Sequence, residues 1–186
     1  YYSEREAEGI EHHLEGIYNR YNVAAAAAIG RYFCIEEEAV RRAIGSYLPD
    51  NNRSQREERE TNTLIIDCYN ANPSSMAASL GHFGQEPLGE KSRKAIILGD
   101  MLELGEDSVA EHVAVVRKAL ECGLQKICLV GGEFGKALQE VSAENIEHFM
   151  TSDELSMWLE KSGIEGAVVL VKGSRGTRME KIVCKL

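Results

Sequence analysis

The stretch Ile-Ile-Asp-Cys-Tyr-Asn-Ala-Asn-Pro-Ser-Ser, residues 65–75, decides the fold of this chain. It opens inside a short apolar run, passes through the polar residues Asp67, Tyr69 and Asn70, and reaches Asn72 followed by Pro73. Asparagine caps free backbone N–H groups and proline tolerates the first helical position, so this pair predicts a helix start. The stretch therefore predicts a buried strand that turns through polar residues into a helix.

The same alternation continues to the end of the chain. Short runs rich in Val, Ile and Leu alternate with longer segments of helical spacing, a pattern typical of parallel strands joined by crossover helices. We expect strands at 63–69, 94–98, 126–130, 146–149 and 168–171, with a last short strand near 181–184. We expect helices at 74–83, 109–121, 134–141 and 152–161. The fold class is therefore α/β with a mostly parallel sheet.

The residues before Thr63 have a different character. The segment 22–33 is alanine-rich and helical, and 35–48 carries apolar residues at helical spacing, yet no strands alternate with them. The polar segment 49–62 is typical of a linker or hinge. We therefore divide the chain into the tail of another domain (1–48), a hinge (49–62) and an α/β domain (63–186).

Composition narrows the classes of function. A formal charge of -9 argues against general nucleic-acid binding, which depends on clustered Lys and Arg. No apolar run approaches the ~20 residues of a membrane helix, and no basic segment followed by an apolar one begins the chain, so we expect a cytoplasmic protein without membrane insertion. The five cysteines form no Cys-x-x-Cys pair, which predicts buried free thiols, and no histidine has metal-ligand spacing.

The first candidate site is the end of the 63–69 strand. In open parallel sheets, ligands bind at the carboxyl ends of the strands, and a following helix N-terminus attracts anions. A plain capped turn is the alternative, but it explains Asn72 and leaves Asp67, Tyr69 and Asn70 unexplained.

A second candidate is the acidic segment Ala-Ile-Ile-Leu-Gly-Asp-Met-Leu-Glu-Leu-Gly-Glu-Asp-Ser, residues 95–108. Asp100 and Glu103 could bind a cation or an amine, whereas Glu106 and Asp107 fit a solvated loop that precedes a helix. His112, on the next helix, is interpreted as an ordinary, partly buried residue.

A third candidate follows the 168–171 strand, where a glycine-containing loop carries Ser174 and three cations, Lys172, Arg175 and Arg178. Such cations suit a carboxylate or a phosphate, and surface cations beside a hairpin are the alternative.

The glycine spacing of 130–135 is wrong for a dinucleotide loop and indicates a tight turn. The sequence has no phosphate-binding P-loop, so any ATP phosphates would be held elsewhere.

Five segments carry a family resemblance in their order along the chain. They are Gly-Ile-Tyr-Asn-Arg-Tyr-Asn-Val-Ala-Ala-Ala-Ala-Ala-Ile-Gly (16–30), Pro-Asp-Asn-Asn-Arg-Ser-Gln (49–55), the stretch 65–76, the segment 97–108, and Leu-Val-Lys-Gly-Ser-Arg-Gly-Thr-Arg-Met-Glu-Lys-Ile-Val (170–183). Together they resemble the Mur ligases, and in particular the branch that adds D-alanyl-D-alanine. Tyr-Asn-Ala-Asn-Pro and Gly-Asp-Met-Leu-Glu-Leu-Gly are specific to this branch, and Lys-Gly-Ser is shared more loosely.

The resemblance implies a three-domain enzyme. A first domain holds the UDP-N-acetylmuramoyl-tripeptide, a central P-loop domain holds ATP with Mg²⁺, and a Rossmann-like C-terminal domain with helices on both faces closes over them. ATP phosphorylates the tripeptide carboxylate, and the amine of D-alanyl-D-alanine attacks the acyl phosphate. This chain would carry the last domain and the final helices of the central one, so we expect it to be inactive alone.

The resemblance also implies roles for individual residues, although it assigns no catalytic residue to this chain. The ATP-binding residues would be Asn19 and Asn22 near the adenine, Arg53 at the hinge, and Asp67 near the ribose. The substrate-binding residues would be Tyr69, Asn70, Asn72, Lys172, Ser174 and Arg175. Two positions depart from the family pattern, because Tyr18 stands where relatives often have histidine and Cys68 replaces a small polar residue.

Two other interpretations stay open. The first is another amide-forming relative, such as the meso-diaminopimelate-adding ligase or a folylpolyglutamate synthase, whose strand-end motifs differ. The second is a non-catalytic Rossmann-like module, which would bind nucleotide by itself. A ligase fragment without a P-loop would instead bind ATP weakly or not at all.

Overall fold

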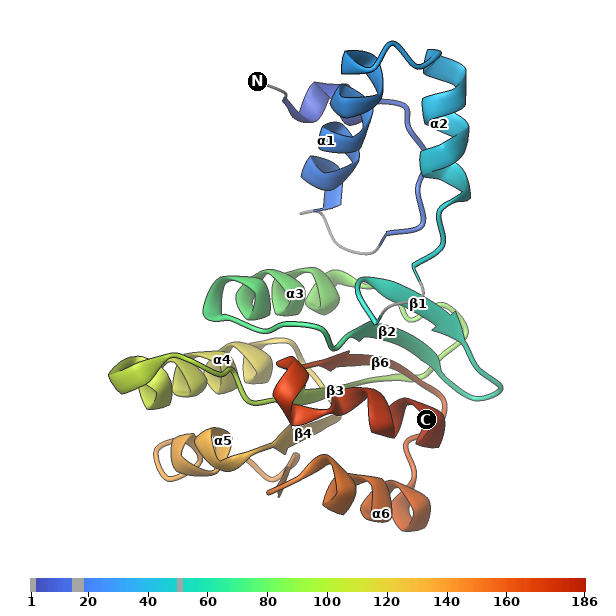
Figure 1. Ribbon diagram of the computed structural model, residues 1–186. Coiled ribbons are helices and arrows are strands. Elements are labelled where there is room, and N and C mark those ends of the chain that lie inside the picture. Colours follow the sequence, from blue (N-terminus) through green and yellow to red (C-terminus); the bar gives the residue numbers. More distant parts are fainter. Residues whose placement is uncertain (1–2, 15–18, 50–51) are drawn as a thin grey trace.

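The computed structural model describes residues 3–14, 19–49 and 52–186. An N-terminal helical part, formed by the short 3-10 helix η1 (Glu4–Ala7) with α1 (Asn19–Tyr32) and α2 (Glu37–Ser46), lies beside an α/β part (Figure 1). The helical part lies over the sheet edge that carries β1 (Figure 1). The two helices expected from the sequence in this region are confirmed.

Within the described residues, six strands form one sheet in the order β1-β2-β6-β3-β4-β5. Their bounds are β1 (Gln55–Glu58), β2 (Thr63–Asp67), β3 (Arg93–Gly99), β4 (Lys126–Val130), β5 (Ile146–Phe149) and β6 (Ala167–Lys172). All neighbours pair in parallel except β1, which pairs antiparallel with β2. The mostly parallel sheet predicted from the sequence is therefore confirmed.

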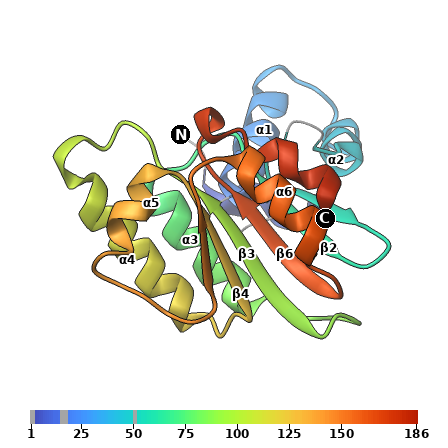
Figure 2. The same cartoon turned by 90° about the horizontal axis from the view of Figure 1, so that it is seen from below.

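Helices cover both faces of the sheet, as Figure 2 shows. On one face lie α3 (Pro73–Gln85), α4 (Ser108–Glu121) and α5 (Gly132–Ala137), and on the other lie α6 (Ser152–Ser162) and the 3-10 helix η4 (Met179–Lys185). Successive strand residues point to opposite faces, so Ile65 packs with α3 and α4 while Leu64 and Ile66 pack with α6 and η4. Both faces are buried, which explains the continuous apolar strand sequences.

Two elements differ from the sequence expectations. Strand β1 lies inside the polar segment 49–62, which was expected to be a linker. It is an edge strand whose residues are alternately half-buried and exposed, so its sequence contains no apolar residues that would predict a strand. The strand expected at 181–184 is wrong, because the segment forms the 3-10 helix η4. Met179, Ile182 and Val183 are spaced three and four residues apart, and this helical spacing buries them against α6.

The cysteines are all free, as expected, but they are not all buried. Burial raises the pKa of Cys68 and of Cys128 to about 12, which keeps both as thiols. Cys34 and Cys184 are exposed, so the expectation of burial is wrong for these two.

Asn62 joins the amino-terminal edge of the sheet to the end of the chain. Its side chain is fully buried; Nδ2 donates to the carbonyls of Ile164 (2.6 Å) and Leu186 (2.7 Å). Its Oδ1 accepts from the backbone N–H of Ala167 at 3.1 Å. These three bonds hold the start of β2 beside the start of β6.

We expect Asn62→Ala to lower the free energy of unfolding by about 3 kcal/mol, because it leaves two buried polar groups and one half-buried carbonyl without their partner. The matched control is Asn145→Ala, which removes one bond from a half-buried side chain to the Leu124 carbonyl and should cost about 1 kcal/mol. Urea denaturation of both variants tests the difference. Equal losses would contradict the bridging role of Asn62.

Candidate functional site

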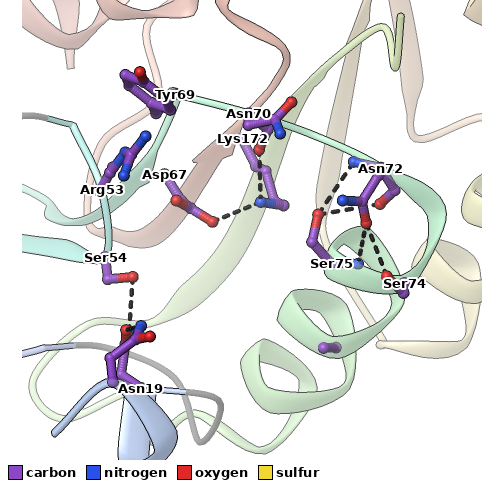
Figure 3. Close-up of a pocket in the computed structure, with 12 residues that line it drawn as sticks. Asn19, Arg53, Ser54, Asp67, Tyr69, Asn70, Asn72, Ser74, Ser75 and Lys172 are labelled. Carbon is purple, nitrogen blue, oxygen red and sulfur yellow. Dashed lines mark hydrogen bonds and ion pairs between the residues drawn. The ribbon is translucent and has the colours of Figure 1, made fainter. Parts of the chain in front are cut away.

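The carboxyl ends of β2, β6 and β3 meet at one edge of the sheet, next to the N-terminus of α3. A cleft of about 520 Å³ opens there, between this edge and α1 (Figure 3). Its lining consists of Asn19, Asn22, Arg53, Ser54, Asp67, Tyr69, Asn70, Asn72, Ser74, Ser75, Ala78 and Lys172.

Eight of the ten binding residues predicted from the sequence line this one cleft, and only Ser174 and Arg175 do not. The cleft also includes four residues that the sequence reasoning missed: Ser54, Ser74, Ser75 and Ala78. The two serines after Pro73 could have been found, since they occupy the first turn of the helix that Asn72 starts. Ser54 carries no sequence signal, because it lies in a polar segment without a motif.

A buried ion pair joins the tips of β2 and β6. Asp67 and Lys172 are register partners, and Nζ of Lys172 lies 2.5 Å from Oδ2 of Asp67 (Figure 3). The Lys172 side chain is only 1% exposed and also donates to the carbonyl of Asn70 at 3.2 Å. A buried ammonium is stable only with such a partner. Lys172 is therefore not an isolated cation of the loop, and its charge is balanced within the edge.

Asn72 starts α3, as the sequence predicted. Its Oδ1 accepts from the Ser75 N–H and from the Ser74 hydroxyl, both at 2.9 Å, and the Ser75 hydroxyl accepts from the Asn72 N–H at 3.1 Å (Figure 3). This capping box fixes the direction of a 13-residue helix whose N-terminus borders the cleft. The positive end of the helix dipole therefore contributes to the cleft.

Two guanidinium groups flank Tyr69. The Cζ atom of Arg53 lies 3.3 Å from the centre of the Tyr69 ring, and the Cζ atom of Arg175 lies 5.6 Å from it. These are cation–π distances. Arg175 does not line the cleft, yet its contact with Tyr69 brings it to the rim, where both cations could bind an anionic group.

The helical part contributes to the cleft through α1. Nδ2 of Asn22 donates to Oδ1 of Asn19 at 2.7 Å, and Nδ2 of Asn19 donates to the Ser54 hydroxyl at 2.9 Å. These bonds join α1 to the turn that carries Arg53. Tyr18, the position that departs from the family pattern, lies outside the described residues.

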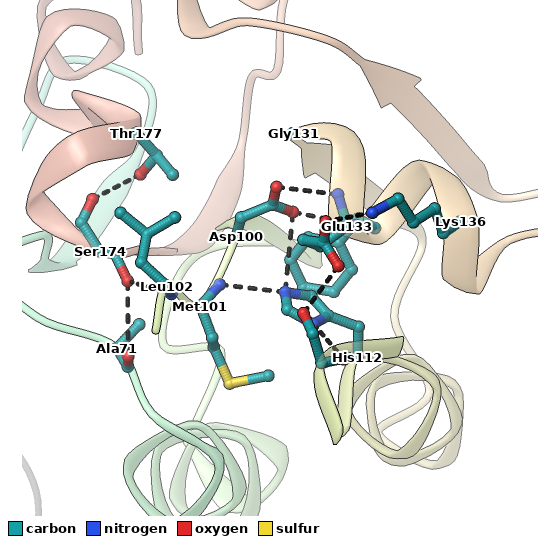
Figure 4. A network of polar contacts seen from close by, with 12 residues as sticks. Ala71, Asp100, Met101, Leu102, His112, Gly131, Glu133, Lys136, Ser174 and Thr177 are labelled. Atoms are coloured by element: carbon teal, nitrogen blue, oxygen red, sulfur yellow. Dashed lines mark hydrogen bonds and ion pairs between the residues drawn. The ribbon is translucent and has the colours of Figure 1, made fainter. Parts of the chain in front are cut away.

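The acidic segment after β3 turns its first carboxylate inward (Figure 4). Asp100 is 6% exposed and accepts from the N–H groups of Glu133 and Phe134, each at 2.9 Å. Gly131 has φ +122, and a Cβ there would lie 2.2 Å from the Asp100 carboxylate. Asp100 therefore binds the first turn of α5 (Gly132–Ala137), and the expectation that it binds a cation or an amine is not supported.

His112 is fully buried, so the expectation of partial burial is wrong. Its Nε2 lies 3.0 Å from the N–H of Met101, and its Nδ1 lies 2.7 Å from the carbonyl of Ser108 (Figure 4). Since the Met101 N–H donates to Nε2, the ring proton is on Nδ1. The imidazole thus holds the loop after β3 against α4.

Ser174 connects three strand tips. Its hydroxyl donates to the Ala71 carbonyl at 3.4 Å after β2 and accepts from the Leu102 N–H at 3.2 Å after β3 (Figure 4). The residue is 4% exposed. This geometry favours a role in holding the loops together over direct contact with a ligand.

Among the described residues, no three His, Cys, Asp or Glu side chains gather as metal ligands. Asp67 faces Lys172 and Asp100 faces backbone N–H groups, so neither carboxylate is arranged for Mg²⁺. The described helices include none that is long and apolar enough to cross a membrane.

The family description "Mur ligase, glutamate ligase domain" matches residues 52–175, which cover the sheet and the loops at its carboxyl edge. The chain belongs to the Mur ligase family. UDP-N-acetylmuramoyl-tripeptide--D-alanyl-D-alanine ligases of this family are similar along almost the whole chain. The protein from Treponema pallidum is 31% identical over 91% of this chain, and that from Bacillus subtilis is 31% identical over 90% of it. The chain spans about 37% of the length of each.

Solved Mur ligase structures have the same fold. The MurF structure from Acinetobacter baumannii is 28% identical, with a TM-score of 0.79 over 92% of this chain and 38% of that chain. The MurF ligase of Thermotoga maritima, solved in complex with ADP, is 20% identical with a TM-score of 0.71 over the same 92% and 38%, which shows the fold alone.

We expect Asp67→Ala in this Mur ligase chain to lower the free energy of unfolding by about 3 kcal/mol, because it leaves the Lys172 ammonium buried without a carboxylate. The double variant Asp67→Ala/Lys172→Met should regain most of that loss, since no buried charge remains. Urea denaturation of wild type, both single variants and the double variant gives the coupling energy. Additive losses would show that the pair does not hold the edge.

Proposed function

We propose that this chain is the closing domain of a longer Mur ligase that joins D-alanyl-D-alanine to a UDP-N-acetylmuramoyl-tripeptide at the expense of ATP. The observation that carries the proposal is the single cleft that gathers eight residues chosen from the sequence by family resemblance. The Tyr-Asn-Ala-Asn-Pro motif at 69–73 supports the D-alanyl-D-alanine branch, as do the names of the similar proteins.

The nucleotide side of the cleft is formed by the residues near α1. Asn19 and Asn22 offer side-chain amides, which suit the donor and acceptor edge of an adenine base. Arg53 then contacts the nucleotide phosphates from the hinge, and Asp67 faces the ribose hydroxyls. The P-loop that binds the ATP phosphates, and the Mg²⁺ site, belong in this proposal to parts of the enzyme outside this chain.

The substrate side is formed by Tyr69, Asn70, Asn72 and Arg175. A guanidinium binds a carboxylate through two parallel hydrogen bonds, so Arg175 is our choice for the dipeptide carboxylate. Lys172 contributes indirectly, because its charge is paired with Asp67, and Ser174 positions the loops around it.

The reaction needs little covalent chemistry from these residues. ATP transfers its terminal phosphoryl group to the tripeptide carboxylate, the dipeptide amine attacks that carbonyl carbon, and phosphate leaves as the peptide bond forms. Such a route depends on positioned cations and an enclosed site with little water. The contribution of this chain is closure over the nucleotide and orientation of the amine.

We expect the full-length parent to release phosphate only when the tripeptide nucleotide and D-alanyl-D-alanine are both present. Arg175→Ala should lower kcat/KM for the dipeptide at least about tenfold, because a charge-assisted contact is lost. Asn72→Ala should also lower it, and Asn72→Asp, which keeps a helix cap but removes the amide donors, separates capping from contact. The matched control is Arg117→Ala on the exposed side of α4. Unchanged rates for Arg175→Ala and Asn72→Ala would refute this site assignment.

The isolated 186-residue chain should bind ATP weakly or not at all, because it has no P-loop to hold the phosphates. Isothermal titration of the chain with ATP measures this directly. Tight binding by the chain alone would instead favour the non-catalytic nucleotide-binding module.

A further inference from the structure

Tyr69 makes both of the contacts between an arginine and an aromatic ring that occur among the described residues. The Cζ atoms of Arg53 and Arg175 lie 3.3 Å and 5.6 Å from the centre of its ring. Both distances fall within the roughly 6 Å over which the face of a ring attracts a cation. One ring therefore contacts two guanidinium groups that come from segments far apart in the sequence.

The backbone fixes the position of this ring through the residues on either side of it. The N–H of Cys68 donates to the carbonyl of Asn52 at 2.8 Å, which ties the residue before the ring to the residue before the first arginine. The carbonyl of Asn70 accepts from Nζ of Lys172 at 3.2 Å. Lys172 ends β6, and the 3-10 helix η3 (Arg175–Thr177), which begins with the second arginine, follows it. The ring is thus tied to both segments that carry its arginines.

The two guanidinium groups, in contrast, end long and flexible side chains. Arg53 and Arg175 are both exposed, and Figure 3 shows the Arg53 side chain beside the Tyr69 ring. Within the part of the chain that the structure describes, neither side chain forms a hydrogen bond or an ion pair. The ring is therefore the contact that restricts them, and it leaves their N–H donors to a ligand.

We propose, on the basis of the proposed function, that Tyr69 is a positioning residue whose ring holds both guanidinium groups in place for their ligands. These ligands are the nucleotide phosphates for Arg53 and the dipeptide carboxylate for Arg175. Two parallel hydrogen bonds to such an anion require the guanidinium in a defined plane. An aromatic face restricts that plane without using the N–H donors. The phenol hydroxyl has no part in this role.

The test is steady-state kinetics of the full-length parent with Tyr69→Leu and Tyr69→Phe. Tyr69→Leu should lower kcat/KM about fivefold for ATP and also for D-alanyl-D-alanine, because a cation–π contact at a partly exposed site is worth about that factor. Tyr69→Phe keeps the aromatic face and should stay within about twofold of the wild type for both substrates.

The arginine variants show whether the ring acts through these side chains. Tyr69→Leu should cost nothing further in kcat/KM for ATP when Arg53→Ala is already present. It should cost nothing further in kcat/KM for the dipeptide when Arg175→Ala is present. Trp158→Leu is the matched control, since its half-buried ring lies 5.7 Å from Nζ of Lys126 and outside the cleft. It should leave both values unchanged.

Three results would overturn the inference. One is an equal loss for Tyr69→Leu with and without the arginines, since the ring would then act independently of them. Another is a loss confined to one of the two substrates, and the third is a loss for Tyr69→Phe as large as that for Tyr69→Leu. If the unsubstituted parent releases no phosphate with the tripeptide nucleotide and D-alanyl-D-alanine, the proposed function itself fails and the role of Tyr69 fails with it.

Discussion

Lys172 carries an ammonium group of which almost nothing is exposed to water, and Asp67 on the neighbouring strand makes this possible. The desolvation of one such ion costs several kcal/mol, and only a close, well-oriented counter-charge offsets it. The pair is therefore sensitive to the register between β2 and β6, since slippage by one residue would point the two side chains to opposite faces. The turn 68–72 and the loop 173–178 both begin directly after this pair, so their positions depend on it.

The polar residues at the same edge have two different tasks. Asp100, His112 and Ser174 are buried and bond to backbone groups of neighbouring segments, which fixes the segments after β2, β3, β4 and β6 relative to one another. The other group, which includes Arg53, Tyr69 and Asn70, is exposed and faces the cleft. The first group makes the second rigid, which is the arrangement expected where a substrate must be oriented.

Arg53 shows how the backbone aims a side chain at this site. The residues on either side of it, Asn52 and Ser54, have φ values of 57° and 49°, a left-handed conformation that costs about 1 kcal/mol or more for a residue with a Cβ. The carbonyl of Asn52 accepts from the Cys68 N–H at 2.8 Å, and Asn19 bonds Ser54. These contacts offset the strain and bring the guanidinium over the Tyr69 ring.

Local chemistry in the sequence determined the α/β class, the start of α3 at Asn72 and the candidate residues at the ends of β2 and β6, whereas the cleft residues before β1 were chosen by family resemblance. The reason is that apolar runs and a helix cap act within a few residues, and parallel strands must end at one edge. Only the tertiary structure decided which polar groups face the cleft, because the partners of Lys172 and Ser174 lie about a hundred residues away along the chain. The tertiary structure also revealed the polar edge strand β1. This strand pairs with β2 through backbone hydrogen bonds, and its side chains show no apolar pattern from which a strand could be predicted.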